Sequence, residues 1–415
     1  MNISRRGLLA AGTGAGMALL TGCGSNTGLA ASSSGPTLSQ WYHEYGEAGT
    51  EQAVKRYAAA YSKAKVVVQW RPGNYDQQTA AALLTDSGPD VFEGSPTLDQ
   101  IQGGQVVDLT ELLDGVKDDF NPAVLAPKTY DGKIWGVPQV IDMQMLYYRK
   151  SLLKNAGIEP PTTVDELVEA AKALTTSQVK GLFLGNDGGA GALAGTPLYA
   201  AGLQFVTPDG KVGFDDPAAA AVLSKLHQMY ADKSLLLGAP ADWSDPSAFN
   251  QGLTAMQWTG LWALPEVQQA LGDDFGVLPF PKDGSGVPAV PVGAYGSAVS
   301  ARSRNQEAAK EYVQWLWVDN TADQEDFATS YGIHIPARIS LAEKAAKLKS
   351  GAAADAVTFT TDYGFAQPLL WTTAAGNAYQ DALTRIIQSG ADAESQLRTV
   401  VQTATAELAR VEKKP

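Results

Sequence analysis

Cysteine is nearly absent from this chain of 415 residues. Its single cysteine, Cys23, excludes a disulfide within the chain, and three histidines are too few for the Cys/His cluster of a structural zinc site. The glycine run from Gly185 to Gly191 lacks the Gly-Lys-Ser/Thr ending that a phosphate-binding loop needs. The sequence therefore predicts no metal and no cofactor.

Basic charge is also scarce. The chain has 31 Lys and Arg residues against 44 Asp and Glu residues, which gives a formal net charge of −13. No block of basic residues is dense enough to form the positive face that nucleic acids require, so we expect no nucleic-acid partner. With this length and 45% hydrophobic residues the chain can bury one large or two medium cores, and two is the expectation.

Recognisable sets of catalytic side chains are missing as well. There is no G-x-S-x-G motif, the histidines lie in unrelated contexts, and no pair of carboxylates stands out for glycoside hydrolysis. The sequence therefore predicts that the protein is not an enzyme. Two alternatives from other classes stay open. One is a secreted, lipid-anchored carbohydrate hydrolase, and the other is a surface scaffold that binds a protein through an exposed apolar patch.

The first residues have the order of an export signal. Arg5 and Arg6 precede a Gly/Ala-rich apolar run that is too short to span a membrane. The paired arginines resemble a twin-arginine signal, and the tetrapeptide that ends at Cys23 resembles the lipobox of bacterial lipoproteins. This resemblance implies a signal peptide over residues 1–22, a lipid on Cys23 and a flexible tether over residues 23–36. We expect an exported protein that only its lipid anchors to the outer face of the cytoplasmic membrane.

Short β-type runs alternate with longer helical patterns along the rest of the chain. Leu38 to Tyr42 and Val66 to Trp70 are predicted strands on either side of a predicted helix from Glu51 to Lys63. Asp90 to Phe92 is a predicted buried strand, and Thr163 to Glu166 form a capping box that opens a helix. Further helices are predicted over residues 76–85, 217–230, 305–318, 322–331 and 391–411. The alternation predicts an α/β fold with a largely parallel sheet, in one large domain or in two lobes that exchange strands.

Aromatic residues occur at the ends of several predicted strands and in loops. The chain has 9 Trp and 15 Tyr residues, and each offers an apolar face with a polar edge. That combination suits a sugar ring, whose hydroxyls also need polar partners because a buried group left unpaired costs about 1–3 kcal/mol. Any single aromatic residue can equally belong to the core, as we expect for Trp258. The pattern favours a polyhydroxylated ligand.

Five short motifs occur in the order and spacing of one known family. They are Ser87 to Phe92; Tyr130 to Pro138 followed by Leu146 to Leu153; Pro161 to Leu167; Ala255 to Trp262; and Gly276 to Pro281 followed by Val292 to Val299. From about Leu38 to the C-terminal helix the chain resembles the extracellular solute-binding proteins of ABC sugar importers, the family that contains maltose-binding protein. Val164 stands where this family commonly has Trp, which is a small departure.

The resemblance implies a two-lobe α/β fold of the class II periplasmic-binding-protein type, with a ligand cleft between lobes that are joined by hinge crossovers. Lobe 1 would combine residues 37–140 with 295–345, and lobe 2 would combine residues 141–294 with 346–415. The implied partners are a carbohydrate ligand and the permease subunits of an ABC transporter, with the binding protein itself a monomer. A di- or oligosaccharide is the expected ligand, and a non-sugar solute such as a polyol or polyamine is the alternative.

The same resemblance implies most of the ligand-binding residues. Asp142 would lie in the first crossover, and Trp262 matches the Trp whose ring stacks on sugar in this family. Asn186 is added from the sequence itself, because the glycine run in which it lies is either a flexible loop or a source of hydrogen bonds to a ligand. The full set of candidates is Glu44, Tyr45, Glu93, Ser95, Asp142, Asn186, Trp262, Tyr295, Gly296 and Trp371.

Overall fold

The computed structural model of the chain describes residues 35–293 and 295–412. The predicted signal peptide (1–22), Cys23 and all but the last two residues of the predicted tether (23–36) lie outside the described residues. Within the described ranges, none of the helices combines the length and the apolar character needed to cross a membrane.

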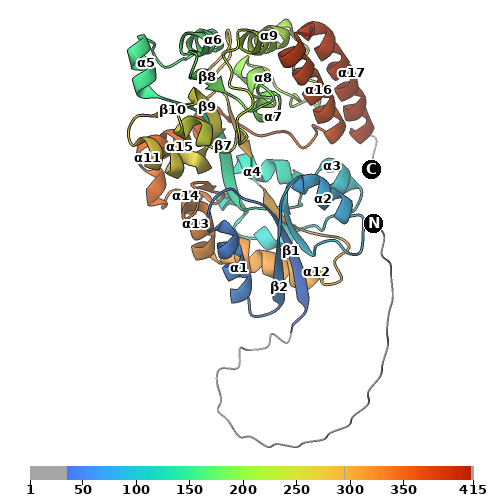
Figure 1. Cartoon of the computed structure of the whole chain (residues 1–415). Coiled ribbons are helices and arrows are strands. Elements are labelled where there is room, and N and C mark those ends of the chain that lie inside the picture. Colours follow the sequence, from blue (N-terminus) through green and yellow to red (C-terminus); the bar gives the residue numbers. More distant parts are fainter. Residues whose placement is uncertain (1–34, 294, 413–415) are drawn as a thin grey trace, which may run out of the picture.

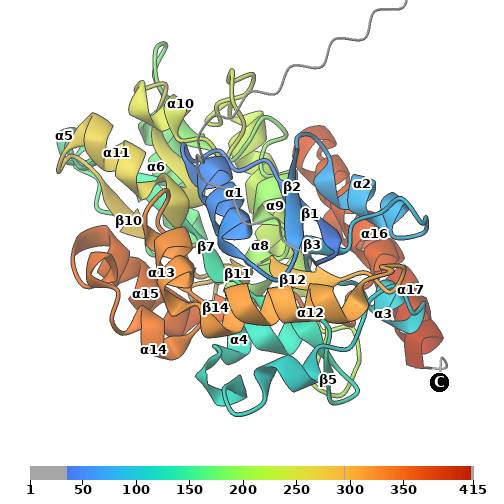
Figure 2. The ribbon, with the colours of Figure 1, turned by 90° about the horizontal axis from the view of Figure 1, so that it is seen from below.

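A five-stranded sheet forms the centre of what we call the first lobe. Its strands, in spatial order, are β2 (Lys65–Arg71), β1 (Thr37–His43), β3 (Val91–Gly94), β12 (Gly296–Val299) and β6 (Val137–Pro138). The helices of this lobe are α1 (Thr50–Ala60), α2 (Tyr75–Ala82), α3 (Leu98–Gln102), α4 (Pro122–Leu125), α12 (Gln306–Gln314), α13 (Thr321–Thr329) and α14 (Ile339–Ala342). Figure 2 shows α1 and α12 beside the strands, and a small hairpin of β4 (Thr129–Tyr130) and β5 (Lys133–Ile134) lies next to them.

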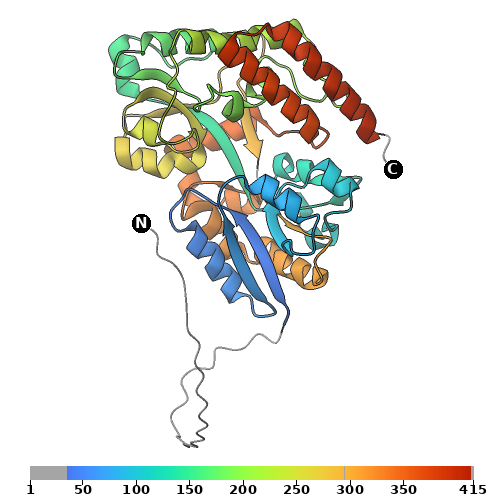
Figure 3. The ribbon, with the colours of Figure 1, turned by 45° about the vertical axis from the view of Figure 1, so that its right-hand side comes forward.

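A larger mixed sheet forms the centre of the second lobe. Its main strands, in spatial order, are β14 (Gly364–Phe365), β11 (Val290–Gly293), β7 (Val140–Tyr148), β9 (Thr254–Gly260) and β8 (Lys180–Phe183); β10 (Gly276–Leu278) and β13 (Ile335–Pro336) also pair with β7. Its helices are α5 (Lys150–Ala156), α6 (Val164–Ala173), α7 (Ala190–Leu193), α8 (Thr196–Ala200), α9 (Pro217–Ala231), α10 (Ser247–Asn250), α11 (Leu264–Leu271), α15 (Gly351–Tyr363), α16 (Thr373–Ser389) and α17 (Ala393–Glu412). Figure 3 shows α16 and α17, in red, side by side along this lobe.

The chain passes between the lobes three times, before β7, after β11 and between α14 and α15, and the first two connections are short. β6 belongs to the first sheet and is followed at once by β7 of the second, and β11 of the second sheet is followed closely by β12 of the first. Figure 1 shows the two lobes one above the other, with β7 rising between them.

The prediction of a largely parallel sheet holds for most strands, but one strand in each of the two large sheets runs against the others. β12 runs antiparallel to β3 and β6, and β7 runs antiparallel to β9, β10 and β11. The reason is the strand exchange itself, because β7 and β12 each enter their sheet from the other lobe. Parallel pairing is kept where strand and helix alternate within one lobe, as between β1 and β2.

Local sequence signals explain several of these elements. All four residues of β3 are buried, as the apolar run at Asp90 to Phe92 predicts. The predicted capping box is formed, since Thr163 accepts a hydrogen bond from the backbone of Glu166 while the Glu166 side chain bonds back to the cap. The predicted helix over residues 305–318 is α12, which continues as a π-helical turn over Trp315–Asp319.

Each lobe buries its own apolar residues, although one core extends across the crossovers. Trp258 on β9 is fully buried, and its Nε1 donates to Gln144 Oε1 at 2.8 Å, so its predicted place in the core is confirmed. Met143 and Tyr147 on β7 belong to a core that also holds residues of the first lobe, such as Tyr42. β7 is therefore packed against both lobes, which fixes its position at their junction.

Candidate functional site

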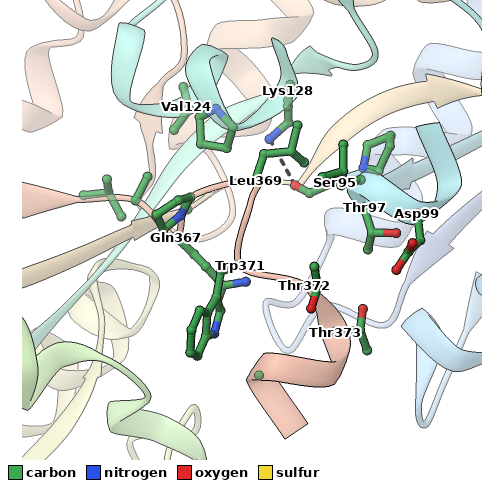
Figure 4. A pocket seen from close by; sticks show the side chains of 18 of the residues that line it. Ser95, Thr97, Asp99, Val124, Lys128, Gln367, Leu369, Trp371, Thr372 and Thr373 are labelled. Atoms are coloured by element: carbon green, nitrogen blue, oxygen red, sulfur yellow. Dashed lines mark hydrogen bonds between the residues drawn. The ribbon is translucent and has the colours of Figure 1, made fainter. Parts of the chain in front are cut away.

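A cavity of about 360 Å³ lies between the two lobes, and we call it the interlobe cavity. This volume lies in the range of about 300–1,000 Å³ that small-molecule sites occupy. The first lobe contributes the segment after β3 and part of α4, and the second lobe contributes the end of β11 and the segment before α16. Figure 4 shows Ser95, Thr97, Asp99 and Lys128 of the first lobe, with Leu369 of the second lobe beside Lys128 and Ser95, and Trp371, Thr372 and Thr373 farther along the second-lobe segment.

Glu93 organises the polar residues at the end of the first sheet. Only 1% of its surface is exposed, and Glu93 Oε2 accepts hydrogen bonds from His43 Nδ1 at 2.6 Å and from His43 N at 3.2 Å. Glu93 Oε1 accepts a bond from the Tyr45 hydroxyl. Burial lowers the pKa of His43, but the neighbouring Glu93 carboxylate outweighs this effect and raises it above its usual value. Glu93 therefore lies behind His43 and Tyr45 and fixes their orientation.

Asp142 lies on β7 and takes part in a second buried ion pair. His334 Nδ1 lies 2.5 Å from Asp142 Oδ1, and His334 Nε2 lies 3.3 Å from Glu47 Oε1. Burial alone would lower the pKa of His334, but the two carboxylates raise it to about 10. His334 is therefore a cation at neutral pH, and it ties the crossover strand to the first lobe.

A small pocket of the first lobe brings together further polar side chains. His43, Glu44, Asn74, Asp76 and Tyr295 line it, with a volume of about 260 Å³. The Tyr295 hydroxyl donates to Asp76 Oδ1 at 3.3 Å, and the rings of Tyr295 and His43 lie 4.7 Å apart between centroids. This pocket offers carboxylates and ring faces side by side, which are the groups that bind hydroxyls and C–H faces.

Lys128 lies in the wall between the first lobe and the interlobe cavity. Its Nζ donates to Ser95 Oγ at 3.0 Å, and burial lowers its pKa to about 8 although the Asp142 carboxylate opposes this shift. A Cβ atom at Gly296 would lie 2.6 Å from Lys128 Cε. Gly296 is a predicted site residue, and because it has no side chain the Lys128 side chain can occupy the space beside it.

Trp262 lies in the second lobe, where its ring is partly exposed. Its Nε1 donates to the backbone oxygen of Ser244 at 2.9 Å, and its ring meets that of Trp243 edge to face at 5.9 Å. A Cβ atom at Gly260 would lie within 2.0 Å of the Trp262 ring, so a glycine is required there. The two rings form a partly exposed aromatic pair, although Trp262 does not line the interlobe cavity.

Asn186 and Trp371 are engaged with other parts of the second lobe. Asn186 Nδ2 donates to Ala239 O at 3.1 Å, and Asn186 Oδ1 accepts from Ala239 N at 2.7 Å. Trp371 is 5% exposed, and its ring stacks on Phe205 with centroids 4.2 Å apart. Trp371 nevertheless lines the interlobe cavity, whereas Asn186 does not.

The structure therefore groups the predicted residues by lobe. Near the junction it brings together Glu44, Tyr45, Glu93, Ser95, Asp142, Tyr295 and Gly296, whereas Trp262 and Asn186 lie apart in the second lobe.

Four residues near the junction were not predicted from the sequence, namely His43, Asp76, Lys128 and His334. His43 could have been found, because it directly follows the predicted strand Leu38 to Tyr42 and precedes Glu44; the observed strand β1 includes it. In the part of the chain that the structure describes, no group of three His, Cys, Asp or Glu side chains could hold a metal ion.

A sequence profile of the family described as bacterial extracellular solute-binding protein matches residues 41–317. Among curated proteins, the diacetylchitobiose binding protein DasA of Streptomyces coelicolor is 26% identical over 391 residues, which cover 88% of each chain. The galactooligosaccharide-binding protein of Bacillus subtilis is 25% identical over 417 residues, which cover 94% of each chain.

Solved structures of the same kind share the fold. A solute-binding protein of an ABC transporter from Thermotoga lettingae, bound with alpha-D-tagatose, gives a TM-score of 0.77 at 20% identity and covers 90% of this chain and 100% of its own. The GacH receptor of Streptomyces glaucescens, solved unliganded and with acarbose, gives 0.75 at 23% identity and covers 90% of this chain and 99% of its own. The predicted two-lobe α/β fold is confirmed.

Proposed function

The chain belongs to the family of bacterial extracellular solute-binding proteins, and on that premise we propose that it captures a carbohydrate for an ABC transporter. The observation that carries this proposal is a cavity between the lobes that both lobes line. Its relatives include a diacetylchitobiose, a galactooligosaccharide and a maltodextrin binding protein, which supports a di- or oligosaccharide as the ligand.

Binding would work by closure of the lobes around the sugar. The lobes would be residues 37–140 with 295–345 and residues 141–294 with 346–415. They would rotate about the crossover before β7 and the crossover after β11. Asp142 lies in the first crossover and Tyr295 follows the second, so both would move against the opposite lobe as it closes. Release of the sugar to the permease subunits would require the reverse motion and no chemical step.

The ligand would lie between the polar end of the first sheet and the aromatic pair of the second lobe. Glu44, Tyr45, Ser95, Asp142 and Tyr295 would bind hydroxyl groups. Trp262 would stack on a sugar ring once the lobes close, and the edge of the Trp371 ring would contact the sugar. Glu93, Asn186 and Gly296 would act through their neighbours, because each is already bonded to or packed against protein groups.

Export and attachment rest on the sequence motifs. A twin-arginine-like signal would direct export, and a lipid on Cys23 would hold the monomeric protein at the outer face of the cytoplasmic membrane. Replacement of Cys23 by Ser should release the protein into the medium, and persistent membrane attachment of this variant would contradict the lipid anchor.

The first test is the melting temperature of the protein against a panel of sugars. The panel contains chitobiose, galactooligosaccharides, maltodextrins, polyols, polyamines and uronic acids. A ligand at 100 times its dissociation constant adds about 2.7 kcal/mol of stability, so one sugar class should raise the melting temperature clearly. The variant Asp142→Ala should lose that shift. Turnover of the bound sugar would favour the hydrolase, and a shift with polyols or polyamines alone would overturn the sugar ligand.

A further inference from the structure

The last helix of the chain reaches across to the first lobe. Near the end of α17, Arg410 Nη1 donates to Asp99 Oδ1 at 2.9 Å and Arg410 Nη2 donates to Asp99 Oδ2 at 3.2 Å. Gln102 Nε2 also donates to the backbone oxygen of Val411 at 3.3 Å. Asp99 and Gln102 belong to α3 and the other two residues belong to α17, so these bonds join the lobes directly.

Arg410 is held in place by neighbours of the second lobe. Its Nη2 donates to Glu407 Oε2 at 2.7 Å, and its Nε donates to Glu407 Oε1 at 3.1 Å. Glu407 Oε2 also accepts a bond from Thr372 Oγ1 at 2.9 Å. The planar guanidinium can bind two carboxylates at once because its donors are fixed in a fork. We call this continuous chain of Thr372, Glu407, Arg410 and Asp99 the α3–α17 bridge.

Both ends of the α3–α17 bridge are residues that line the interlobe cavity. Asp99 lines it from the first lobe and Thr372 from the second, and Figure 4 shows both at this cavity. Leu369, which precedes Thr372, packs against an apolar cluster of the first lobe that includes Trp41 and Phe92. Bonds and apolar contacts from one lobe to the other therefore close this rim.

We propose that the α3–α17 bridge is an end wall of the ligand cleft, and that Asp99 and Arg410 limit the length of the sugar chain that binds. This inference rests on the proposed function and names its substrate more closely as a short oligosaccharide whose end lies against the wall. A longer chain would have to break the two hydrogen bonds between Arg410 and Asp99. Such a penalty rejects long chains without strengthening the contacts to short ones.

The test is the ratio of two dissociation constants, measured on the full chain. The probes are the disaccharide and the hexasaccharide of the series that raises the melting temperature. In the variant Arg410→Ala, the hexasaccharide should gain about threefold in affinity relative to the disaccharide, the size expected when a solvent-exposed ion pair is lost. Arg410→Lys keeps the charge without the planar fork, so it should give a smaller gain. The double variant Asp99→Arg with Arg410→Asp should restore the parent's preference for the disaccharide over the hexasaccharide.

A matched control removes an ion pair that lies within one lobe. Arg302 Nη1 bonds Asp86 Oδ1 at 3.1 Å on the surface of the first lobe, so Arg302→Ala should leave the ratio unchanged. Melting temperatures measured without sugar show whether each variant folds. If Arg410→Ala does not fold, the ratio of dissociation constants is compared between Arg410→Lys and the parent. An unchanged ratio in both Arg410 variants would overturn the end wall while the proposed function stands. Failure of the parent protein to bind any sugar would overturn both.

Discussion

The two lobes hold the side chains of their candidate site residues by different means. In the first lobe, buried charged groups such as Glu93 and His334 are bonded to charged or polar neighbours. In the second lobe, Trp371 is fixed by stacking on another ring and Asn186 by two backbone bonds. One side of the cleft therefore depends on protonation, and the other depends on packing and neutral hydrogen bonds. This contrast decides which substitutions and which conditions should affect each side.

The largest effect should follow the loss of the Trp371 ring. Trp371→Ala removes a ring stacked among Phe205, Phe214 and Tyr379, and such deletions cost about 3–5 kcal/mol. Urea unfolding should show this loss. Trp262→Ala removes the same ring from a partly exposed position, so it should cost less stability and more sugar affinity. If Trp371→Ala kept its stability and lost only affinity, the second lobe would not be held by packing at this point.

The second prediction concerns the response of stability to pH. The pKa of His334 is raised from 6.5 to about 10, so the folded state binds more protons between these values than the unfolded state. The stability from His334 is fully present below pH 6.5 and is lost as the pH rises toward 10, by at most about 1.4 kcal/mol per unit.

Lys128 should act in the opposite direction. Its pKa is lowered from 10.5 to about 8, so here the unfolded state binds more protons and stability increases from pH 8 to 10.5. The free energy of unfolding, measured with urea from pH 6 to 10, should therefore fall less steeply with pH for His334→Gln than for the parent. For Lys128→Met it should fall more steeply than for the parent above pH 8. Trp371→Ala should shift the whole profile and keep its slope. Parallel profiles for all four proteins would contradict the electrostatic account of the first lobe.

Much of this fold could be predicted because its signals are local. The strands β1, β2 and β3 are short apolar runs, and α6 begins with its own capping box. α16 was not predicted, although its N-cap Thr372 accepts a bond from the backbone of Ala375 as a capping threonine does. The reversed directions of β7 and β12 could not be predicted, because they depend on which lobe a strand enters and not on its own residues.

The positions of the site residues could be predicted better than their surroundings. Glu93 and Ser95 follow a strand, and that place is visible in the sequence. The contact of Glu93 with His43 is not visible, because fifty residues separate them and only the pairing of β1 with β3 brings them together. Lys128 carries no periodic signal at all. Its role becomes apparent only when the space beside Gly296 is known.

The smallest effect should separate a structural amide from a ligand-binding one. Asn186→Ala removes two hydrogen bonds to the backbone of Ala239, and each such bond contributes about 0.5–1.5 kcal/mol. Because the residue is exposed, we expect the free energy of unfolding measured with urea to fall by only about 1 kcal/mol. The sugar affinity should change less than twofold. Asn74→Ala is the matched control, since it removes an amide from the pocket of the first lobe. A large loss of affinity in Asn186→Ala alone would mean that the second lobe also offers polar groups to the sugar, and the contrast between the lobes would then be one of degree.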